Sequence, residues 1–583
     1  MHVIATAGHV DHGKSTLIRA LTGMEPDRWA EERRRGMTID LGFAWTPLPS
    51  GRQIAFVDVP GHERFVANML AGVGSVPAVM LVVAADEGWM PQSAEHLAAL
   101  DALGVRHGLL VVTRCDLADH AVALARAREE LSPTGLAGAE AVTVSGTTGA
   151  GLAELRTALD RLVAGLPDPD PGADVRLWVD RAFTIRGAGA VVTGTLAGGR
   201  LGVGDELVVA PSMRPVRVRG LQSLGKPVSE AAGVCRVAVN LRGVPVEEVS
   251  RGQALLTPGR WLTIDKIDVR LRGDAATDLP ATCMLHVGSA QLAVQVRPLG
   301  ADTARLSLAS PVPLRIGDRA LLRDPGRHRI PAGVTVLDVR PPALRRRGAA
   351  GARARELAAQ DGRPDGAGEL RRRLVVRSAE LLAMGATPPA APVAGDWLVE
   401  PAHLGALRQR LAALVAEHAA RHPLEHGLPT EAARRLLDLP DIRLVTALVS
   451  APLALVAGRI SQGGPSLPPP VARAVASLRS DLLANPYAAP PAGRLTELGL
   501  GSRELAAAVR AGALTRVADG IYLLPEALAD VGGRLAGLPQ PFSVSEARSA
   551  LATSRRVAVP LLELLDAQGR TQRLPDDRRQ VLQ

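Results

Sequence analysis

One short run, GHVDHGKS at residues 8–15, constrains the fold of this chain more than any other feature. It fits the pattern G-x-x-x-x-G-K-[S/T], follows the apolar run HVIATA and precedes the helix-like run STLIRALTG. In that setting the glycines let the backbone curl round phosphate groups with its N–H groups inward, and the helix N-terminus adds positive potential. The sequence therefore predicts a phosphate-binding loop between a strand and a helix of an α/β domain, and a glycine-rich turn of chance resemblance is the alternative.

Two side chains of this loop have predicted roles on the nucleotide. Lys14 is expected to reach the β- and γ-phosphate oxygens, and Ser15 to ligate Mg²⁺. Of the 68 basic residues only Lys14, Lys226 and Lys266 are lysines, so a lysine here indicates that a compact ammonium is needed where a guanidinium would be too wide. The predicted nucleotide-binding residues of the loop are Gly8, His9, Val10, Asp11, His12, Gly13, Lys14, Ser15 and Thr16.

A second group of candidates follows the apolar run IAFVDV, at the end of a predicted strand where open α/β sheets bind ligands. Asp58 can hold Mg²⁺ through water, and the Gly61 N–H can meet the γ-phosphate. His62 would orient the attacking water and is the predicted catalytic residue. Thr38 is the candidate that closes over Mg²⁺, with an ordinary surface threonine as the alternative. The predicted Mg²⁺ ligands are Ser15, Thr38 and Asp58.

Residues after two further strand-like runs are candidates for reading the base. Thr113, Arg114 and Asp116 follow the run GLLVV, and Ser145 and Gly146 follow AVTV. A carboxylate at Asp116 can accept hydrogen bonds from the N1–H and the exocyclic amine of guanine, a donor pair that adenine lacks. The usual guanine motif is Asn-Lys-x-Asp, from which this chain departs at its first two positions. We therefore expect a preference for guanine and leave the nucleotide affinity open.

Longer patterns divide the 583 residues into several domains, since one domain usually spans roughly 100 to 200 residues. Apolar runs without strict alternation predict a parallel sheet buried on both faces, and so an α/β domain. β-rich runs broken by glycine predict one or two β-barrels, and helical patterns ending in short hairpins predict tandem winged helices. We expect a P-loop GTPase domain at 1–170, β-barrels at 174–260 and 261–340, a linker at 341–372 and winged helices at 373–583.

Details of the last two segments refine this division. The arginine-rich segment 341–372 has no clear core face, so a linker or boundary helix with solvated charges is favoured over a binding site. In the tail, Ser543 and Glu546 fit a capping box before a helix, and Asp519-Gly520 signals a hairpin turn. The recurrence of helix, helix and hairpin predicts about four winged-helix units, the last at about 541–583.

Composition excludes several classes of protein. The chain is 47% hydrophobic and 22% charged, as globular proteins are, and no apolar run reaches the roughly eighteen residues of a membrane span. Three cysteines without a CxxC spacing predict neither a disulfide framework nor a cysteine metal site, and with no leader-like start they favour the cytoplasm. The formal net charge of +9 points to polyanionic partners.

The runs GHVDHGKS, RGMTIDLGF, DVPGHE and VVAADEGWMPQSAEHL resemble the translational GTPases, and most of all the family of selenocysteine-specific elongation factors. The closing run SRRVAVPLLELLDAQGRTQR is similar to that family's last winged helix. The resemblance implies a GTPase domain with two β-barrels and a winged-helix tail, with GTP, GDP and Mg²⁺ as ligands. It also implies delivery of selenocysteyl-tRNA to the ribosome at recoded UGA codons, while the tail grips an mRNA hairpin. A monomer suits such a ribosomal ligand.

The resemblance also places an aminoacyl pocket on Phe43, Asp180, Arg181 and Arg236. A selenol is more acidic than a thiol or an alcohol, so it would be anionic at neutral pH and the two arginines can select it by charge. The family often has tyrosine where Phe43 stands, so any hydroxyl contact is lost. The alternative for both arginines is ordinary salt bridging within a barrel.

In the tail, Arg555 and Arg556 open the second helix of the last winged unit, and Arg570 and Arg573 lie on its wing. Helix starts and wings are where such modules meet nucleic-acid backbone. Thr553 or Ser554 would cap that helix, leaving N–H groups for a phosphate. The predicted hairpin-binding residues are Ser554, Arg555, Arg556, Arg570 and Arg573, and a solvated basic face is the alternative.

Two other functions stay open from the sequence. One is a GTPase carrier of another aminoacyl-tRNA or of initiator tRNA. The other is a nucleotide-gated DNA-binding regulator, because winged helices commonly bind duplex DNA.

Overall fold

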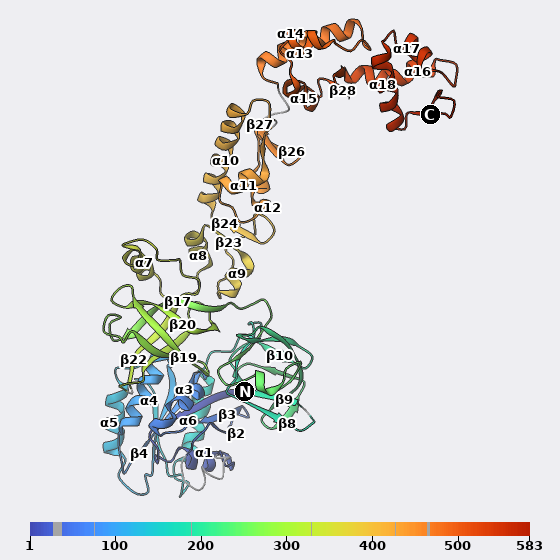
Figure 1. Ribbon diagram of the computed structural model, residues 1–583. Coiled ribbons are helices and arrows are strands. Elements are labelled where there is room, and N and C mark those ends of the chain that lie inside the picture. The colour runs from blue at the N-terminus through green and yellow to red at the C-terminus, as the bar shows by residue number, and fades with distance from the viewer. Residues whose placement is uncertain are drawn as a thin grey trace. The chain divides into compact units, whose positions relative to one another are not determined.

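The computed structural model describes residues 1–26, 38–74, 76–187, 189–327, 329–425, 427–462 and 467–582. The chain divides into two compact units (Figure 1), one made of Met1–Arg372 with Arg377–Ala390 and the other of Arg373–Val376 with Ala391–Gln583. The first unit holds an α/β domain and two β-barrels. The second holds groups of helices with short hairpins.

The first domain is built on a six-stranded sheet of order β2-β3-β1-β4-β5-β6. Its strands are β1 His2–Ala7, β2 Gly42–Pro47, β3 Gln53–Asp58, β4 Ala78–Ala84, β5 His107–Thr113 and β6 Glu140–Thr143. Five of them pair in parallel, which confirms the predicted parallel sheet. β2 instead runs antiparallel to β3 at the sheet edge, and no apolar run predicted it because its burial alternates along the strand.

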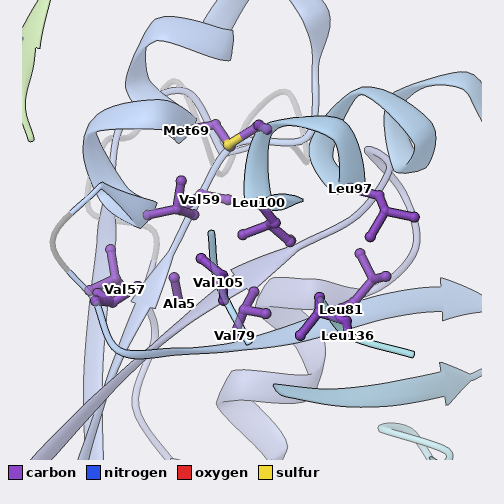
Figure 2. Close-up of a cluster of buried hydrophobic side chains, with 14 of the residues drawn as sticks. Ala5, Val57, Val59, Met69, Val79, Leu81, Leu97, Leu100, Val105 and Leu136 are labelled. Atoms are coloured by element: carbon purple, nitrogen blue, oxygen red, sulfur yellow. The ribbon is translucent and has the colours of Figure 1, made fainter. Parts of the chain in front are cut away.

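Helices cover both faces of this sheet. They are α1 Lys14–Thr22, α3 Val66–Val73, α4 Pro91–Ala102, α5 Ala121–Leu131 and α6 Leu152–Ala164, with the 3-10 turn η1 Glu63–Phe65. Figure 2 shows the core under α3 and α4, where Met69, Leu97 and Leu100 pack with Val79 and Leu81 of β4. The alternate residues of the strands pack against α1 and α6 on the other face. Strands buried on both sides explain the uninterrupted apolar runs.

The first β-barrel closes because β11 pairs with β12 at the ends of the order β11-β16-β7-β9-β15-β12. Its strands are β7 Arg176–Trp178, β8 Arg181–Ile185, β9 Gly189–Leu196, β10 Arg200–Gly202, β11 Glu206–Ala210, β12 Arg214–Ser223, β13 Lys226–Val228, β14 Glu230–Ala232, β15 Cys235–Arg242 and β16 Ala254–Leu256, with the 3-10 turn η2 Val246–Glu248. β15 alternates buried and half-exposed residues, as a barrel strand with one face on a core should.

The second barrel is closed in the order β17-β20-β19-β18-β21-β22. Its strands are β17 Thr263–Gly273, β18 Thr282–Val287, β19 Ala290–Pro298, β20 Thr303–Pro313, β21 Arg319–Asp324 and β22 Arg329–Asp338. Helix α4 of the first domain lies against β21 and β22. The contact is close, because a Cβ on Gly333 would lie 2.5 Å from the carbonyl oxygen of Ala102.

The segment predicted as a solvated linker packs on the second barrel through helix α7, Ala349–Ala358. Arg353 of this helix is 4% exposed, so the solvated interpretation is wrong for it. Its Nε lies 2.7 Å from Asp268, and it also pairs with Asp338 and Glu356. A buried guanidinium is tolerated where carboxylates satisfy it, and composition alone did not reveal these partners. Helices α8 Gly366–Arg373 and α9 Ser378–Ala383 follow.

The strand β23 Val375–Arg377, whose first two residues belong to the second unit, pairs with β24 Trp397–Val399. Three groups of helices follow among the described residues, each with a small sheet. The first group consists of α10 Pro401–Arg421, β25 Leu428–Pro429, α11 Thr430–Leu436, α12 Ile442–Leu448, β26 Leu453–Val456 and β27 Arg459–Gln462. The second consists of α13 Pro469–Ala484, α14 Ala492–Glu497, α15 Ser502–Arg510, β28 Thr515–Ala518 and β29 Ile521–Leu523. The third consists of α16 Pro525–Ala536, α17 Val544–Ala550, α18 Arg555–Ala567, β30 Thr571–Arg573 and β31 Arg579–Val581.

Local signals in the tail are confirmed. Ser543 and Glu546 form the predicted capping box at the start of α17, and Asp519-Gly520 turns the hairpin between β28 and β29. One continuous core joins α13 through α18, with Leu478, Tyr487 and Leu561 among its members. The last two helix groups therefore fold as one body, and a total of four winged units stays a prediction. In the part of the chain that the structure describes, no helix is both long and apolar enough to cross a bilayer.

Candidate functional site

A cavity of about 660 Å³ opens where β1, β3 and β5 end in the first domain. The predicted nucleotide residues that line it are Val10, Asp11, Gly13, Lys14, Ser15, Thr16, Thr38, Gly61, Thr113, Arg114, Asp116 and Gly146. They come from segments spread over the first 146 residues, so parallel strand ends bring them together as the sequence predicted.

The phosphate loop is held in shape from within. The buried Lys14 ammonium donates to the carbonyl oxygens of Gly8 at 3.0 Å and His9 at 2.5 Å. Gly8 has a φ of +131°, and a Cβ there would lie 2.2 Å from the carbonyl oxygen of Val82. Glycine is therefore required at residue 8, and the lysine sits among the loop carbonyls where phosphate oxygens would compete for it.

The three predicted Mg²⁺ ligands meet at the mouth of the loop. Ser15 Oγ donates to Asp58 Oδ2 at 2.7 Å and lies 2.9 Å from Thr38 Oγ1. Thr6 Oγ1 donates to the other Asp58 oxygen at 2.7 Å and fixes the carboxylate. Two hydroxyls and a buried carboxylate are oxygen donors of the kind that Mg²⁺ prefers, so these residues fit the ion.

The segment after β3 packs tightly on the phosphate loop. A Cβ on Gly61 would lie 2.4 Å from Val10 N and 2.5 Å from Lys14 Nζ, so only glycine fits. His62 is turned away from this contact: its Nδ1 accepts from the Arg64 N–H at 3.2 Å and caps η1. The residues found to line the cavity include Gly61 and not His62, so the side chain would have to rotate to take the catalytic role that the sequence predicts.

The residues predicted to read the base lie where the usual Asn-Lys-x-Asp motif would place them. Their first two side chains, however, differ from that motif. Arg114 lies 2.9 Å from both Asp86 and Glu87 and also donates to the carbonyl of Asp11, so it pins the phosphate loop. Thr113 Oγ1 donates to the carbonyl of His12 at 2.8 Å. The remaining two base-end residues follow their strands as expected: Ser145 is buried and accepts from the Thr148 N–H at 3.0 Å, and Asp116 is exposed on the cavity wall.

Two buried histidines support the loop. His96 of α4, which the sequence analysis did not single out, accepts the Gly8 N–H on its Nδ1 at 2.9 Å, and burial lowers its pKa to about 3. His12 contacts the Val82 carbonyl at 3.2 Å, and burial lowers its pKa to about 4. Both rings are therefore neutral at pH 7. The apolar helical spacing around residue 96 signals burial, but nothing local identifies Gly8 as its partner.

The residues predicted for an aminoacyl pocket also come together. The Arg236 guanidinium lies 3.8 Å from the centre of the Phe43 ring, and that of Arg181 lies 5.5 Å from it. Arg236 forms a two-pronged ion pair with the buried Asp180. Thr193, which the sequence did not single out, donates to Asp180 at 2.7 Å and accepts from Arg236 at 3.1 Å. The cluster joins β2 of the first domain to β8, β9 and β15 of the first barrel.

Arg181 connects this cluster to the nucleotide cavity. Its Nη2 lies 2.8 Å from Asp40 and 3.0 Å from the carbonyl oxygen of Leu41. Asp40 stands two residues after Thr38, one of the Mg²⁺ candidates. Through Asp40, the segment that carries Thr38 contacts a guanidinium beside Phe43.

The predicted RNA-binding residues of the tail divide into two kinds. Ser554 is the N-cap residue of α18 but makes no capping hydrogen bond with its side chain, and Arg555 beside it is exposed. The other three are held by the fold: Arg556 donates to the Gly520 carbonyl at 3.2 Å, Arg570 to that of Leu528 at 2.8 Å, and Arg573 to Asp577 at 2.6 Å. The Thr553 hydroxyl, the other predicted cap, instead donates to the carbonyl of Tyr487.

Comparisons with known proteins agree with this geometry. The family model described as elongation factor Tu GTP binding domain matches residues 1–165, and the one described as elongation factor SelB, winged helix, matches residues 534–580. Elongation factor Tu 2 of Streptomyces avermitilis is 32% identical over 366 residues, which cover 56% of this chain and 93% of that protein. The chain belongs to the elongation factor Tu family of translational GTPases, whose first domain binds GTP and GDP and typically Mg²⁺.

Within this family the chain is similar to the selenocysteine-specific elongation factors known as SelB. The factor of Escherichia coli (strain K12) is 39% identical over 346 residues, 58% of this chain and 56% of that protein. The crystal structure of bacterial selenocysteine-specific elongation factor EF-Sec matches with a TM-score of 0.77 and 26% identity, covering 100% of both chains. The chain spans about half the length of the curated selenocysteine-specific relatives that it matches.

Proposed function

We propose that this chain carries selenocysteyl-tRNA to the ribosome at recoded UGA codons, in a complex that depends on bound GTP. The observation that carries the proposal is the pair of guanidinium groups around Phe43, one of them joined through Asp40 to the segment of Thr38. Such an arrangement offers positive charge to an anionic side chain and links that charge to the state of the nucleotide site.

The substrate in this proposal is GTP. Lys14 neutralises charge on its β- and γ-phosphates, and Asp116 accepts from the guanine edge. Mg²⁺ held by Ser15, Thr38 and Asp58 would supply further positive charge on those phosphates. His62 orients the attacking water once its ring leaves the Arg64 N–H, and we propose that the ribosome triggers this rotation. Loss of the γ-phosphate then releases Thr38 and Gly61, and with them the tRNA.

Selection of the amino acid rests on charge. A selenol ionises below neutral pH, whereas the hydroxyl of serine stays neutral. Arg236 and Arg181 are each paired with a carboxylate, Asp180 and Asp40, so an incoming selenolate competes for guanidinium groups that are already in place. Each ~1.4 kcal/mol by which the anion is preferred gives tenfold selectivity. The Phe43 ring lies beside both guanidinium groups, 3.8 Å from that of Arg236 and 5.5 Å from that of Arg181.

In this proposal the tail directs the factor to a particular mRNA. We propose that its last winged helix binds an mRNA hairpin with Arg555 and the uncapped start of α18, since helix N-termini favour phosphate. The similarity of residues 534–580 to the winged helix of elongation factor SelB supports this assignment. A monomeric factor in the cytoplasm would meet both the ribosome and the message.

The experiment is protection of charged tRNA from deacylation by the full chain. With a non-hydrolysable GTP analogue we expect strong protection of selenocysteyl-tRNA and none of seryl-tRNA, and with GDP we expect neither. Equal protection of both tRNAs, or of initiator tRNA, would support the more general carrier. A tail that binds duplex DNA more tightly than RNA hairpins, over a salt titration, would support the DNA regulator.

A further inference from the structure

A second cavity, of about 820 Å³, lies in the first unit away from the sites described above. Its wall combines four parts of the chain: Arg106 after α4, Arg176 of the first barrel, Arg315 and Arg319 of the second barrel, and the segment 361–364 after α7. None of the residues assigned to nucleotide, Mg²⁺ or aminoacyl binding lines it. The volume is within the usual range of small-molecule sites, roughly 300 to 1,000 Å³.

The arginines of this cavity exceed the carboxylates that neutralise them. Arg176 is paired with Asp318 through two contacts of 2.5 and 2.8 Å, and Arg315 with Asp174 at 2.6 Å. Arg106 and Arg319 have no carboxylate partner within the described residues, and Arg319 donates only to Thr335 Oγ1, at 2.7 Å. Burial and the charges of Arg272 and Arg106 lower the pKa of Arg319. One side of the cavity therefore holds uncompensated positive charge.

Trp261 gives the same cavity unmet hydrogen-bond donors. Its ring carries the guanidinium of Arg315 at 3.7 Å and that of Arg176 at 4.6 Å from the ring centre. The indole is 8% exposed, and neither its Nε1–H nor the Nε–H of Arg315 finds an acceptor among the described residues. Buried donors without protein acceptors are uncommon in folded proteins, and these two can donate to water or to the oxygens of a bound anion.

We propose that this cavity binds a small polyphosphate ligand, with Arg106 and Arg319 on its phosphate oxygens and Arg315 and Trp261 on the inner wall. Guanidinium groups match phosphate oxygens through paired hydrogen bonds, and several arginines converging from different segments suit a multiply charged anion. A concave site walled by four segments favours a compact ligand over the backbone of an RNA duplex, which proteins usually meet on open surfaces. A ligand there would join the first domain to both barrels.

The test uses the full chain saturated with GDP in excess Mg²⁺, so that the phosphate loop is already filled. Inorganic tripolyphosphate is then titrated by calorimetry. The variant R106Q/R319Q removes the two uncompensated charges; both side chains are exposed, and the one printed hydrogen bond at stake joins Arg319 to Thr335 on the neighbouring strand, where glutamine can still donate. The matched control is R297Q, an exposed arginine on β19 of the same barrel that does not line the cavity. Unchanged GDP affinity verifies the fold of every variant.

We expect one saturable tripolyphosphate site per chain in the wild type and in R297Q, and at least a tenfold weaker site in R106Q/R319Q. Equal binding by R106Q/R319Q and the wild type would overturn the proposal, as would the absence of any saturable site in GDP-loaded protein. A parallel titration with an RNA duplex tests whether the cavity instead binds the phosphates of a nucleic acid. Binding of the duplex that depends on Arg106 and Arg319, without binding of tripolyphosphate, would also overturn the proposal.

Discussion

The nucleotide cavity and the last winged helix use basic residues in opposite ways. In the cavity, Lys14 is buried among loop carbonyls, and the other predicted groups converge on the same space. In the winged helix, Arg570 and Arg573 bind the fold itself, through a helix carbonyl and a neighbouring carboxylate. Only Arg555 of the predicted tail arginines is exposed without such a bond among the described residues.

This difference shows which charged residues can be assigned a function from the sequence alone. A motif of fixed spacing determines its own backbone, so the direction of its side chains follows from the local fold. An arginine on a helix or a wing has a partner that only tertiary structure supplies. In a chain where nearly all basic residues are arginine, many of them are structural.

The largest effect is expected from the cavity. Lys14→Ala should weaken GTP and GDP binding about a thousandfold, since about 4 kcal/mol of charge-assisted hydrogen bonding to phosphate is lost. Calorimetry with each nucleotide measures it. The matched control is Lys226→Ala, one of the chain's other lysines and exposed on β13, which should leave both affinities unchanged. If Lys14→Ala bound GTP and GDP nearly as tightly as the wild type, the contrast between the nucleotide cavity and the last winged helix would lose its basis.

His62→Ala should lower ribosome-stimulated GTP hydrolysis about a hundredfold, a usual loss when a group that positions or activates water is removed. Formation of the complex with GTP and tRNA should persist, because the hydrogen bond that His62 makes is a local one, accepted from the Arg64 N–H, and His62 is not among the residues found to line the cavity. Rapid-quench measurement of phosphate release tests this. Undiminished hydrolysis would exclude His62 from the reaction.

The buried histidines predict a pH dependence of the first domain. The pKa of His96 is lowered from 6.5 to about 3 in the folded chain. Between these two pH values the unfolded chain binds a proton at this residue and the folded chain does not. The free energy of unfolding is therefore not reduced by His96 above pH 6.5. As the pH falls below 6.5 it decreases, and at pH 5 the loss due to this residue is about 2 kcal/mol. Hydrogen exchange of β1 and β4 amides at pH 7, 6 and 5 measures it. His96→Asn should flatten the slope, and an unchanged slope would contradict the assignment.

The smallest effects sharpen the contrast within the tail. Arg570→Ala should destabilise the last winged helix by about 1 kcal/mol, because the carbonyl of Leu528 loses its donor. Arg555→Ala should leave stability unchanged and weaken hairpin binding about fivefold, with a salt slope smaller by about one. Thermal unfolding and filter binding of the two variants form a matched pair. Equal behaviour of both would show that exposure does not separate structural from binding arginines.

The sequence predicted most of the first domain for physical reasons. The phosphate loop, the strand ends and the residues Ser15, Thr38 and Asp58 follow from spacing and from the rule that parallel strands end at one edge. The class of the tail followed from the capping box at Ser543 and the hairpin at Asp519-Gly520. These features depend on residues close together in the chain or on one sheet edge.

What the sequence did not predict depends on distant partners. His96 meets Gly8 across 88 positions, and Thr193 meets Arg236 across 43. Arg353 appeared to be a solvated linker charge because Asp268 and Asp338 lie in strands of a barrel whose register the sequence does not give. The rotation of His62 away from the cavity is a conformational choice that its motif leaves open.

The most direct measurement is the ratio of the dissociation constants for seryl-tRNA and selenocysteyl-tRNA with the non-hydrolysable GTP analogue, in the wild type and in R236Q/D180N. This double variant removes the guanidinium and its carboxylate together, so no buried charge is left unpaired. We predict a large ratio in the wild type that falls toward one in the variant, where Arg181 is the guanidinium that remains beside Phe43. A ratio equal to that of the wild type would contradict selection of the selenium side chain by the charge of Arg236.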